Sequence, residues 1–304
     1  MSSEHDRIPS FLRSAAAEPL DHLSTLDMVT VINGEDRRIA GAVAACLPEI
    51  ARIVDNAADI IGRGGRVVLI GAGGSGRAAM EAVSEFSPDG DHGLRALVAG
   101  GEKTLLHMRN EAADDYDRGI RDLQSIAFDH NDMLLALSVS GKTPWVWGGL
   151  RHAGSQGSRI ALITGNAASE AAQLAEMIVA PDTGPEVVAG FSTPKAQLAQ
   201  QQILTMIVSG LAIRAGRTWR NMRVDVPFHS DRWCERQIAV VMAASDCSRS
   251  EAKAALQACH RHCPTAILTI LTGMDPGEAR RILKDNDDRL RFALQQTQSP
   301  LAGA

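Results

Sequence analysis

The sequence of 304 residues has few aromatic side chains, which make up only 4% of it. Proteins that bind single-stranded nucleic acids without sequence preference stack the bases on aromatic rings. The formal net charge is -5, whereas a nucleic-acid-binding domain usually carries a basic patch. These two shortages exclude general nucleic-acid binding from the functions that we expect.

Long apolar runs are also missing from the sequence. No stretch approaches the roughly 18 apolar residues that a membrane-spanning helix needs. Residues 1–13 contain acidic side chains and no continuous apolar segment, so they do not resemble a secretory signal. We therefore expect a cytoplasmic protein that has no membrane partner.

Cysteines are few and odd in number, at five. In a chain without a secretory signal, this number indicates reduced thiols. The segment from Cys259 to Cys263 also contains His260 and His262, a composition that invites a metal-site interpretation. A structural zinc site needs four ligands with firm spacing, and the flanking apolar residues are typical of a packed helix. We therefore expect Cys259 and Cys263 to be core residues.

Two loops rich in glycine and hydroxyl side chains each follow a short apolar run. Residues 71–77 read GAGGSGR after the run 67–70, and residues 138–143 read SVSGKT after the run 134–137. Backbone N–H groups and hydroxyls at such strand-to-helix junctions form a cradle for an anion, most often a phosphate. The binding residues that we predict from these loops are Gly73, Gly74, Ser75, Gly76, Ser138, Ser140, Gly141 and Thr143.

The two loops have other interpretations besides phosphate binding. The first loop matches the dinucleotide pattern G-x-G-x-x-G, which also needs an acidic residue at the end of the next strand; the sequence there is Leu97-Val98-Ala99-Gly100. The second loop lacks the first glycine of a nucleotide P-loop, since that position is Ala136. A tight turn without a ligand stays open for the first loop. Hydroxyls that only cap the helix at Pro144 stay open for the second.

Strand and helix patterns alternate along the first two thirds of the chain. The expected strands are residues 66–70, 94–98, 133–137, 160–163 and 177–179. The expected helices include 36–61, with a kink or a division at Pro48, 75–85 and one that begins at Pro144. This order predicts an α/β fold, with a doubly wound parallel sheet and helices on both faces. Residues 195–215 and 230–296 have helical patterns, with a break at 273–276. We expect an N-terminal arm over 1–25, the phosphate-binding domain over 26–229 and a C-terminal helical subdomain over 230–304.

In their order and spacing, the two loops resemble the sugar isomerase (SIS) domain. More narrowly, the chain is similar to the N-acetylmuramic acid 6-phosphate etherases from about residue 20 to 297. Other segments that carry the resemblance are 23–26, 32–36, 84–85, 99–101, 184–187, 221–226 and 259–267. The resemblance implies a phosphorylated amino sugar as substrate, and a homodimer whose sites use residues of both subunits. It also implies that no metal or organic cofactor is required.

Members of that family cleave the D-lactyl ether of the substrate to N-acetylglucosamine 6-phosphate and D-lactate. A base removes the proton on C2 of the open-chain sugar, an acid protonates the departing lactate, and water then adds. This chemistry needs two carboxylates with different pKa values. Glu85 stands where the family has its acid, although the Cys-Pro-Pro that follows there is Phe86-Ser87-Pro88 here. Lys195 keeps a family position and is expected to bind substrate.

The sequence departs from the family around the sugar. The family's base is the second Glu of a Glu-Gly-Ala-Glu-Asp stretch, and alignment without gaps places Ala113 there. Glu111 is the substitute that we name, although two positions along a helix turn a side chain to another side. Gly74 replaces a hydroxyl residue, and in residues 191–198 only Lys195 and Ala196 keep their places. These changes predict that phosphate binding is kept while the rest of the ligand differs.

Two alternatives to an etherase stay open at this point. One is an aldose–ketose isomerase, which also moves a C2 proton, with Glu85, Glu186 or His229 as the base. The other is a phosphosugar sensor without catalysis, which is consistent with the loss of a base at position 113.

Overall fold

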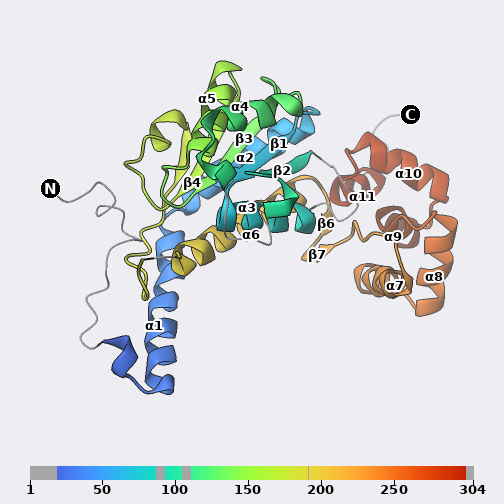
Figure 1. Cartoon of the computed structure of the whole chain (residues 1–304). Coiled ribbons are helices and arrows are strands. Elements are labelled where there is room, and N and C mark those ends of the chain that lie inside the picture. The colour runs from blue at the N-terminus through green and yellow to red at the C-terminus, as the bar shows by residue number, and fades with distance from the viewer. Residues whose placement is uncertain (1–18, 87–92, 105–110, 191, 299–304) are drawn as a thin grey trace. The chain divides into compact units, whose positions relative to one another are not determined.

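The computed structural model describes residues 19–86, 93–104, 111–190 and 192–298. The chain divides into two compact units, the first ending at Ser209 and the second beginning at Gly210. Figure 1 labels the helices and strands of both units.

The first unit is built around a parallel sheet. Its strands are β1 (Val67–Gly71), β2 (Leu94–Val98), β3 (Met133–Ser138), β4 (Arg159–Thr164) and β5 (Met177–Val179), in the order β2-β1-β3-β4-β5. All four pairings are parallel. β1 and β3 are buried along their whole length, which explains why they appear in the sequence as continuous apolar runs. The predicted strands and the α/β class are confirmed, with ends shifted by at most one residue.

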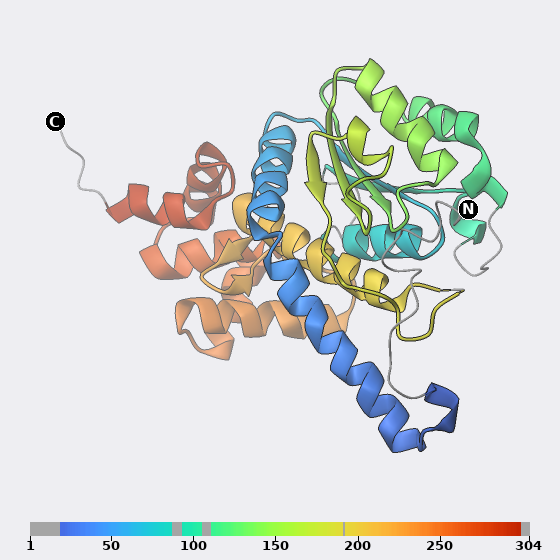
Figure 2. The ribbon, with the colours of Figure 1, turned by 90° about the vertical axis from the view of Figure 1, so that its left-hand side faces the viewer.

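Helices cover both faces of this sheet, as predicted (Figures 1 and 2). On one face, α4 (Tyr116–Ser125) and α5 (Pro144–Ser155) contribute Leu123, Trp145 and Leu150 to a core with Val68 and Leu134 of the strands. On the other side, α2 (Leu47–Gly62) packs against β1 and β5, and α3 (Gly73–Phe86) packs against β1 and β2.

The strand order creates one position that is suited to a ligand. β1 and β3 are neighbours, but the chain leaves β1 towards β2 on one side and β3 towards β4 on the other. Such a reversal opens a crevice at the carboxyl ends of the two strands. Gly71 ends β1 directly opposite Leu137 of β3, so the loops that follow both strands meet at this crevice.

The first helical segment is divided near Pro48, as predicted, and begins earlier than predicted. The chain forms α1 (Thr25–Ala44) and α2, with Pro48 in the first turn of α2. A proline is tolerated there because the first-turn N–H has no partner in the helix. α1 begins earlier than expected because the Ser24 hydroxyl caps it, accepting the N–H of Asp27.

The second unit consists mainly of helices. α6 (Pro194–Arg214) runs across the boundary between the units, and the rest of the second unit comprises α7 (Asp231–Ser245), α8 (Arg249–Ala258), α9 (Cys263–Thr272), α10 (Pro276–Asp285) and α11 (Leu290–Gln298). The predicted break at 273–276 is confirmed, since Gly273 ends α9 and Asp275 caps α10. A two-stranded ribbon of β6 (Thr218–Trp219) and β7 (Met222–Arg223) was not predicted.

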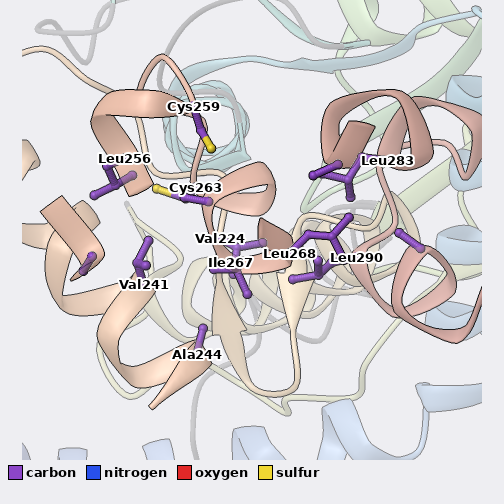
Figure 3. Close-up of a cluster of buried hydrophobic side chains, with 14 of the residues drawn as sticks. Val224, Val241, Ala244, Leu256, Cys259, Cys263, Ile267, Leu268, Leu283 and Leu290 are labelled. Atoms are coloured by element: carbon purple, nitrogen blue, oxygen red, sulfur yellow. The ribbon is translucent and has the colours of Figure 1, made fainter. Parts of the chain in front are cut away.

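Cys259 and Cys263 belong to the core of the second unit. Figure 3 shows both side chains among buried apolar residues such as Leu256 and Ile267. Burial raises the pKa of the Cys263 thiol to about 12, so this thiol stays protonated. The prediction of core cysteines is confirmed. Over the described ranges, we find no group of three His, Cys, Asp or Glu residues arranged to hold a metal.

None of the helices in the described part of the chain is both long enough and apolar enough to cross a membrane.

Candidate functional site

The two predicted loops form one small pocket at the carboxyl ends of β1 and β3. Its volume is about 190 Å³. The first loop provides Ala72, Gly74 and Ser75, the second provides Leu137, Ser138, Val139, Ser140 and Thr143, and the start of α6 adds Thr193 and Gln197. Five hydroxyls and one carboxamide therefore surround a space of the size of a phosphate group.

The second loop is held in shape by its own hydroxyls. Ser138 Oγ accepts the N–H of Gly141 at 3.1 Å and lies 3.0 Å from Thr143 Oγ1. Ser140 Oγ accepts the N–H of Lys142 at 3.1 Å. Gly141 has φ +66° and a Cβ there would overlap the Ser169 side chain, so only glycine fits this turn. Gly141 shapes the loop without lining the pocket.

The hydroxyls of this loop do not cap the following helix. Thr143 occupies the cap position before α5, but its side chain makes no capping hydrogen bond. Thr143 lines the pocket and directly precedes α5. The positive end of the α5 dipole and the first-turn amides that follow Pro144, which itself has no N–H, therefore lie beside the pocket wall. The capping interpretation is contradicted, and the geometry suits an anion.

The first loop brings one hydroxyl into the pocket with a buried partner behind it. Ser75 Oγ donates to Gln200 Oε1 at 3.0 Å, and both side chains are buried. Gln200 Nε2 is buried without a hydrogen-bond partner in the residues that the structure describes. Gly73 begins α3 with φ +53°, and Gly76 packs against Val98. Those two glycines therefore shape the turn, while Gly74 and Ser75 face the pocket.

Gln197 is a pocket residue that the sequence did not point to. A Cβ at position 74 would lie 2.6 Å from Gln197 Oε1 and 2.7 Å from Gln197 Cδ. The carboxamide of Gln197 therefore occupies the space that a side chain at position 74 would fill. The available signal was that Gly74 and Gln197 each depart from the family pattern, but nothing in the sequence pairs these two positions.

Glu186 accepts hydrogen bonds from the backbone at the start of α6. Its side chain is fully buried, Oε2 accepts the N–H of Lys195 at 3.0 Å, and Oε1 accepts the N–H of Ala196 at 3.1 Å. Burial raises the pKa of Glu186, although these backbone bonds favour the ionised form. With both oxygens engaged inside the protein, this carboxylate holds a helix end. It is not placed as the base of an isomerase, and His229 belongs to the second unit.

Lys195 makes a structural ion pair. Its side chain is 2% exposed, and Nζ lies 2.8 Å from Glu35 Oε2 of α1 and 3.0 Å from the carbonyl oxygen of Pro185. The hydrogen bond from Lys195 lowers the pKa of Glu35. Lys195 does not line the pocket, so the structure gives it a contact between α1 and α6 where we had expected a contact with substrate.

The two predicted catalytic carboxylates lie outside the pocket. Glu85 is exposed in the last turn of α3, and Glu111 is exposed at the start of the short 3-10 helix Glu111–Asp114, which also holds Ala113. Neither lines the pocket. The segments 87–92 and 105–110, which adjoin them, lie outside the described residues, as do Ser87 and Pro88 of the stretch compared with the family.

Comparison with known proteins gives close relatives over the whole chain. The N-acetylmuramic acid 6-phosphate etherase of Klebsiella aerogenes is 40% identical over 302 residues, which covers 98% of this chain and 100% of the relative. The protein of the same name from Aeromonas hydrophila is 42% identical over 280 residues, covering 90% and 93%.

Residues 49–153 match the family described as glucokinase regulatory protein N-terminal SIS domain. Among solved structures, a phosphoheptose isomerase from Neisseria gonorrhoeae aligns with a TM-score of 0.49 and 16% identity. This alignment covers 62% of this chain and 100% of the other.

Proposed function

Because the chain belongs to the N-acetylmuramic acid 6-phosphate etherase family, we propose that it cleaves the D-lactyl ether of an amino-sugar 6-phosphate. The products are N-acetylglucosamine 6-phosphate and D-lactate. The observation that carries the proposal is the pocket at β1 and β3, where Ser138, Ser140 and Thr143 surround a phosphate-sized space. It occurs in a chain that matches an etherase from end to end.

The phosphate is the part of the substrate that the described residues support best. Hydroxyls can donate hydrogen bonds to phosphate oxygens, and the first turn of α5 adds backbone amides and a favourable dipole. Gln197 adds a carboxamide whose N–H₂ group is a further donor. In this proposal the pocket anchors the phosphate, and the C2 and C3 atoms of the open-chain sugar extend beyond it.

The reaction is an elimination followed by hydration. A base takes the C2 proton, the C3–O bond breaks, and an acid gives a proton to the lactate oxygen. Water then adds its hydroxyl at C3 and its proton at C2, so the net change is hydrolysis of the ether. We assign the acid to Glu85 and the base to Glu111, whose side chains are both exposed. Ala113, at the family's base position, cannot take a proton.

The test is release of D-lactate from N-acetylmuramic acid 6-phosphate by the purified chain, with Glu85→Gln as the catalytic control. Activity that falls at least 100-fold in Glu85→Gln supports the assignment, since a general acid contributes about 10²–10⁴-fold. Equal lactate release by the wild type and this variant refutes it.

Ala113 favours a second candidate, a phosphosugar sensor without turnover. In this case N-acetylglucosamine 6-phosphate raises the melting temperature of the chain, while no lactate is released from the muramic acid phosphate. A single assay series with both ligands separates the two functions.

We also propose that the protein is a homodimer that acts in the cytoplasm, in the reuse of peptidoglycan sugars. Support for the dimer comes from α1, where Leu26 is 72% exposed and Val29 is 46% exposed. α1 and α6 also border a groove of about 580 Å³ whose walls include Val43, Leu47 and Leu198. Light scattering after size-exclusion chromatography tests this, and a mass of one chain at all concentrations contradicts it.

A further inference from the structure

The second unit contains a cavity whose lining shares no residue with the pocket of the first unit. Its volume is about 520 Å³. The end of α6 contributes Ile213 and Arg214, the segment into β6 contributes Gly216, Thr218, Trp219 and Arg220, and the start of α11 contributes Arg289, Leu290, Arg291 and Phe292. Four of these lining residues are arginines and none is acidic.

Three of these arginines lack a protein counter-ion. Some other arginines of the second unit pair with carboxylates, for example Arg223 with Asp225 at 2.6 Å and Arg280 with Asp288 at 2.8 Å. Over the described residues, by contrast, no carboxylate forms an ion pair with Arg220, Arg289 or Arg291. These three arginines lie around one cavity, where their charges repel each other unless an anion is present.

Arg289 lies in the cavity wall and has one hydrogen-bond donor without a partner among the described residues. Its Nε atom is buried and has no hydrogen-bond partner within the described part of the chain. Burial of an unpaired donor costs about 1–3 kcal/mol, so such atoms call for an explanation. Gly216 makes room for this side chain, because a Cβ there would lie 2.6 Å from Arg289 Cγ.

Aromatic rings orient two of the guanidinium groups. Arg220 lies 5.6 Å from the centre of the Trp219 ring, and Arg289 lies 5.7 Å from the centre of the Phe292 ring. Stacking on a ring limits the motion of a guanidinium while its N–H groups stay able to donate in the plane. Helix α11 begins at Leu290 in the same wall, so the positive end of its dipole also faces an anion bound there.

From these contacts we propose that the cavity binds a small phosphorylated metabolite with at least two negative charges. Guanidinium groups form paired hydrogen bonds with phosphate oxygens, and the volume is within the range of small-molecule sites. A nucleic acid is disfavoured by the net charge of -5. This second anion site lies entirely in residues 213–292, apart from the loops of the first unit, and is suited to a regulatory ligand.

The test is isothermal titration of the full chain with inorganic pyrophosphate, in wild type and in variants. The double variant Arg289→Gln/Arg291→Gln is expected to bind at least tenfold more weakly. The matched control, Arg281→Gln on α10, is exposed and lies outside the cavity, so its affinity stays within about twofold. The variant Ser138→Ala/Ser140→Ala disables the first pocket, and pyrophosphate binding to the second unit is expected to persist in it.

Three results overturn the proposal. They are no binding of pyrophosphate by the wild type, binding that disappears with the serines but not with the arginines, and arginine variants that change the oligomeric state instead of the affinity. Since Arg220 and Arg291 are exposed, single Gln substitutions at each provide a second measurement if the double variant does not fold. Loss of D-lactate release would concern the first pocket, so failure of either proposal is distinguishable.

Discussion

Gly74 and Gln197 share one volume in the pocket, since a Cβ on residue 74 would lie 2.6 Å from Gln197 Oε1. The two positions are far apart in the chain, on α3 and α6. A side chain at position 74 must therefore displace the Gln197 carboxamide.

We expect Gly74→Ser to weaken binding of N-acetylglucosamine 6-phosphate about tenfold, because the new side chain displaces the Gln197 carboxamide. Overpacking of this kind costs about 1–3 kcal/mol. The double variant Gly74→Ser/Gln197→Gly removes the overlap and is expected to bind within about threefold of the wild type. Calorimetric affinities for the four proteins of this cycle give the coupling, and additive effects would contradict the shared volume.

The hydroxyls of the second loop give a direct test of the phosphate site. Ser140→Ala is expected to weaken binding of the same sugar phosphate about tenfold, since a hydrogen bond to a charged group contributes about 1.5–3 kcal/mol. Ser155→Ala, on the exposed last turn of α5, is the matched control and should leave the affinity unchanged. Equal affinities of both variants would remove the loop from the binding site.

Position 113 decides how far the chain retains etherase chemistry. Ala113→Glu restores a carboxylate at the family's base position, so we expect D-lactate release to rise by at least tenfold, since general-base catalysis contributes up to about 10²–10⁴-fold. Ala113→Gln has nearly the same size but cannot act as a base. If both variants behave like the wild type, the base is elsewhere, and Glu111→Gln then tests the residue that we assign.

The ion pair between Lys195 and Glu35 predicts a stability effect without a binding effect. Lys195→Met leaves the Glu35 carboxylate without its ammonium partner and is expected to destabilise the chain by about 3 kcal/mol, since breaking a buried pair costs about 3–5 kcal/mol. Glu35 is 25% exposed, which places the expectation at the lower end. Chemical denaturation measures it, and a variant as stable as the wild type would show that the pair contributes nothing.

His262 predicts a loss of stability at acid pH. Burial, together with the nearby Arg280, lowers the pKa of His262 from 6.5 to about 4. Between pH 6.5 and 4 the unfolded chain binds a proton that the folded chain does not, so stability falls as the pH falls. At 1.36 kcal/mol for each unit, the loss from pH 6.5 to 5 is about 2 kcal/mol.

This loss should shrink in His262→Gln and persist in His130→Gln, whose side chain is exposed. Unfolding of the three proteins at pH 7 and pH 5 provides the comparison. An unchanged pH dependence in His262→Gln would assign the effect to other groups.

The local pattern of the sequence was sufficient for the sheet and for the loops. Strands such as β1 and β3 are buried on both faces, so their apolar runs are unmistakable. The ribbon of β6 and β7 escaped prediction because strands of two residues have no periodicity. The start of α1 was missed although apolar residues stand in its first half; two of them, Leu26 and Val29, are exposed.

The contacts of α6 could not be predicted for another reason. Gln197, Gln200 and Lys195 owe their roles to partners on distant elements, namely Gly74, Ser75 and Glu35. Such pairs depend on tertiary packing, which no window of neighbouring residues contains. The family resemblance placed Lys195 at the substrate, whereas its buried ammonium group contacts Glu35.

The bond between Glu35 and Lys195 also has a consequence for synthesis of the chain. The two residues are 160 positions apart, and a ribosome adds about 5–20 residues per second. Lys195 is therefore synthesised roughly 8–32 seconds after Glu35. During this interval α1 lacks the contact that fixes it to the start of α6, and its exposed apolar side chains are available to chaperones or to another nascent chain.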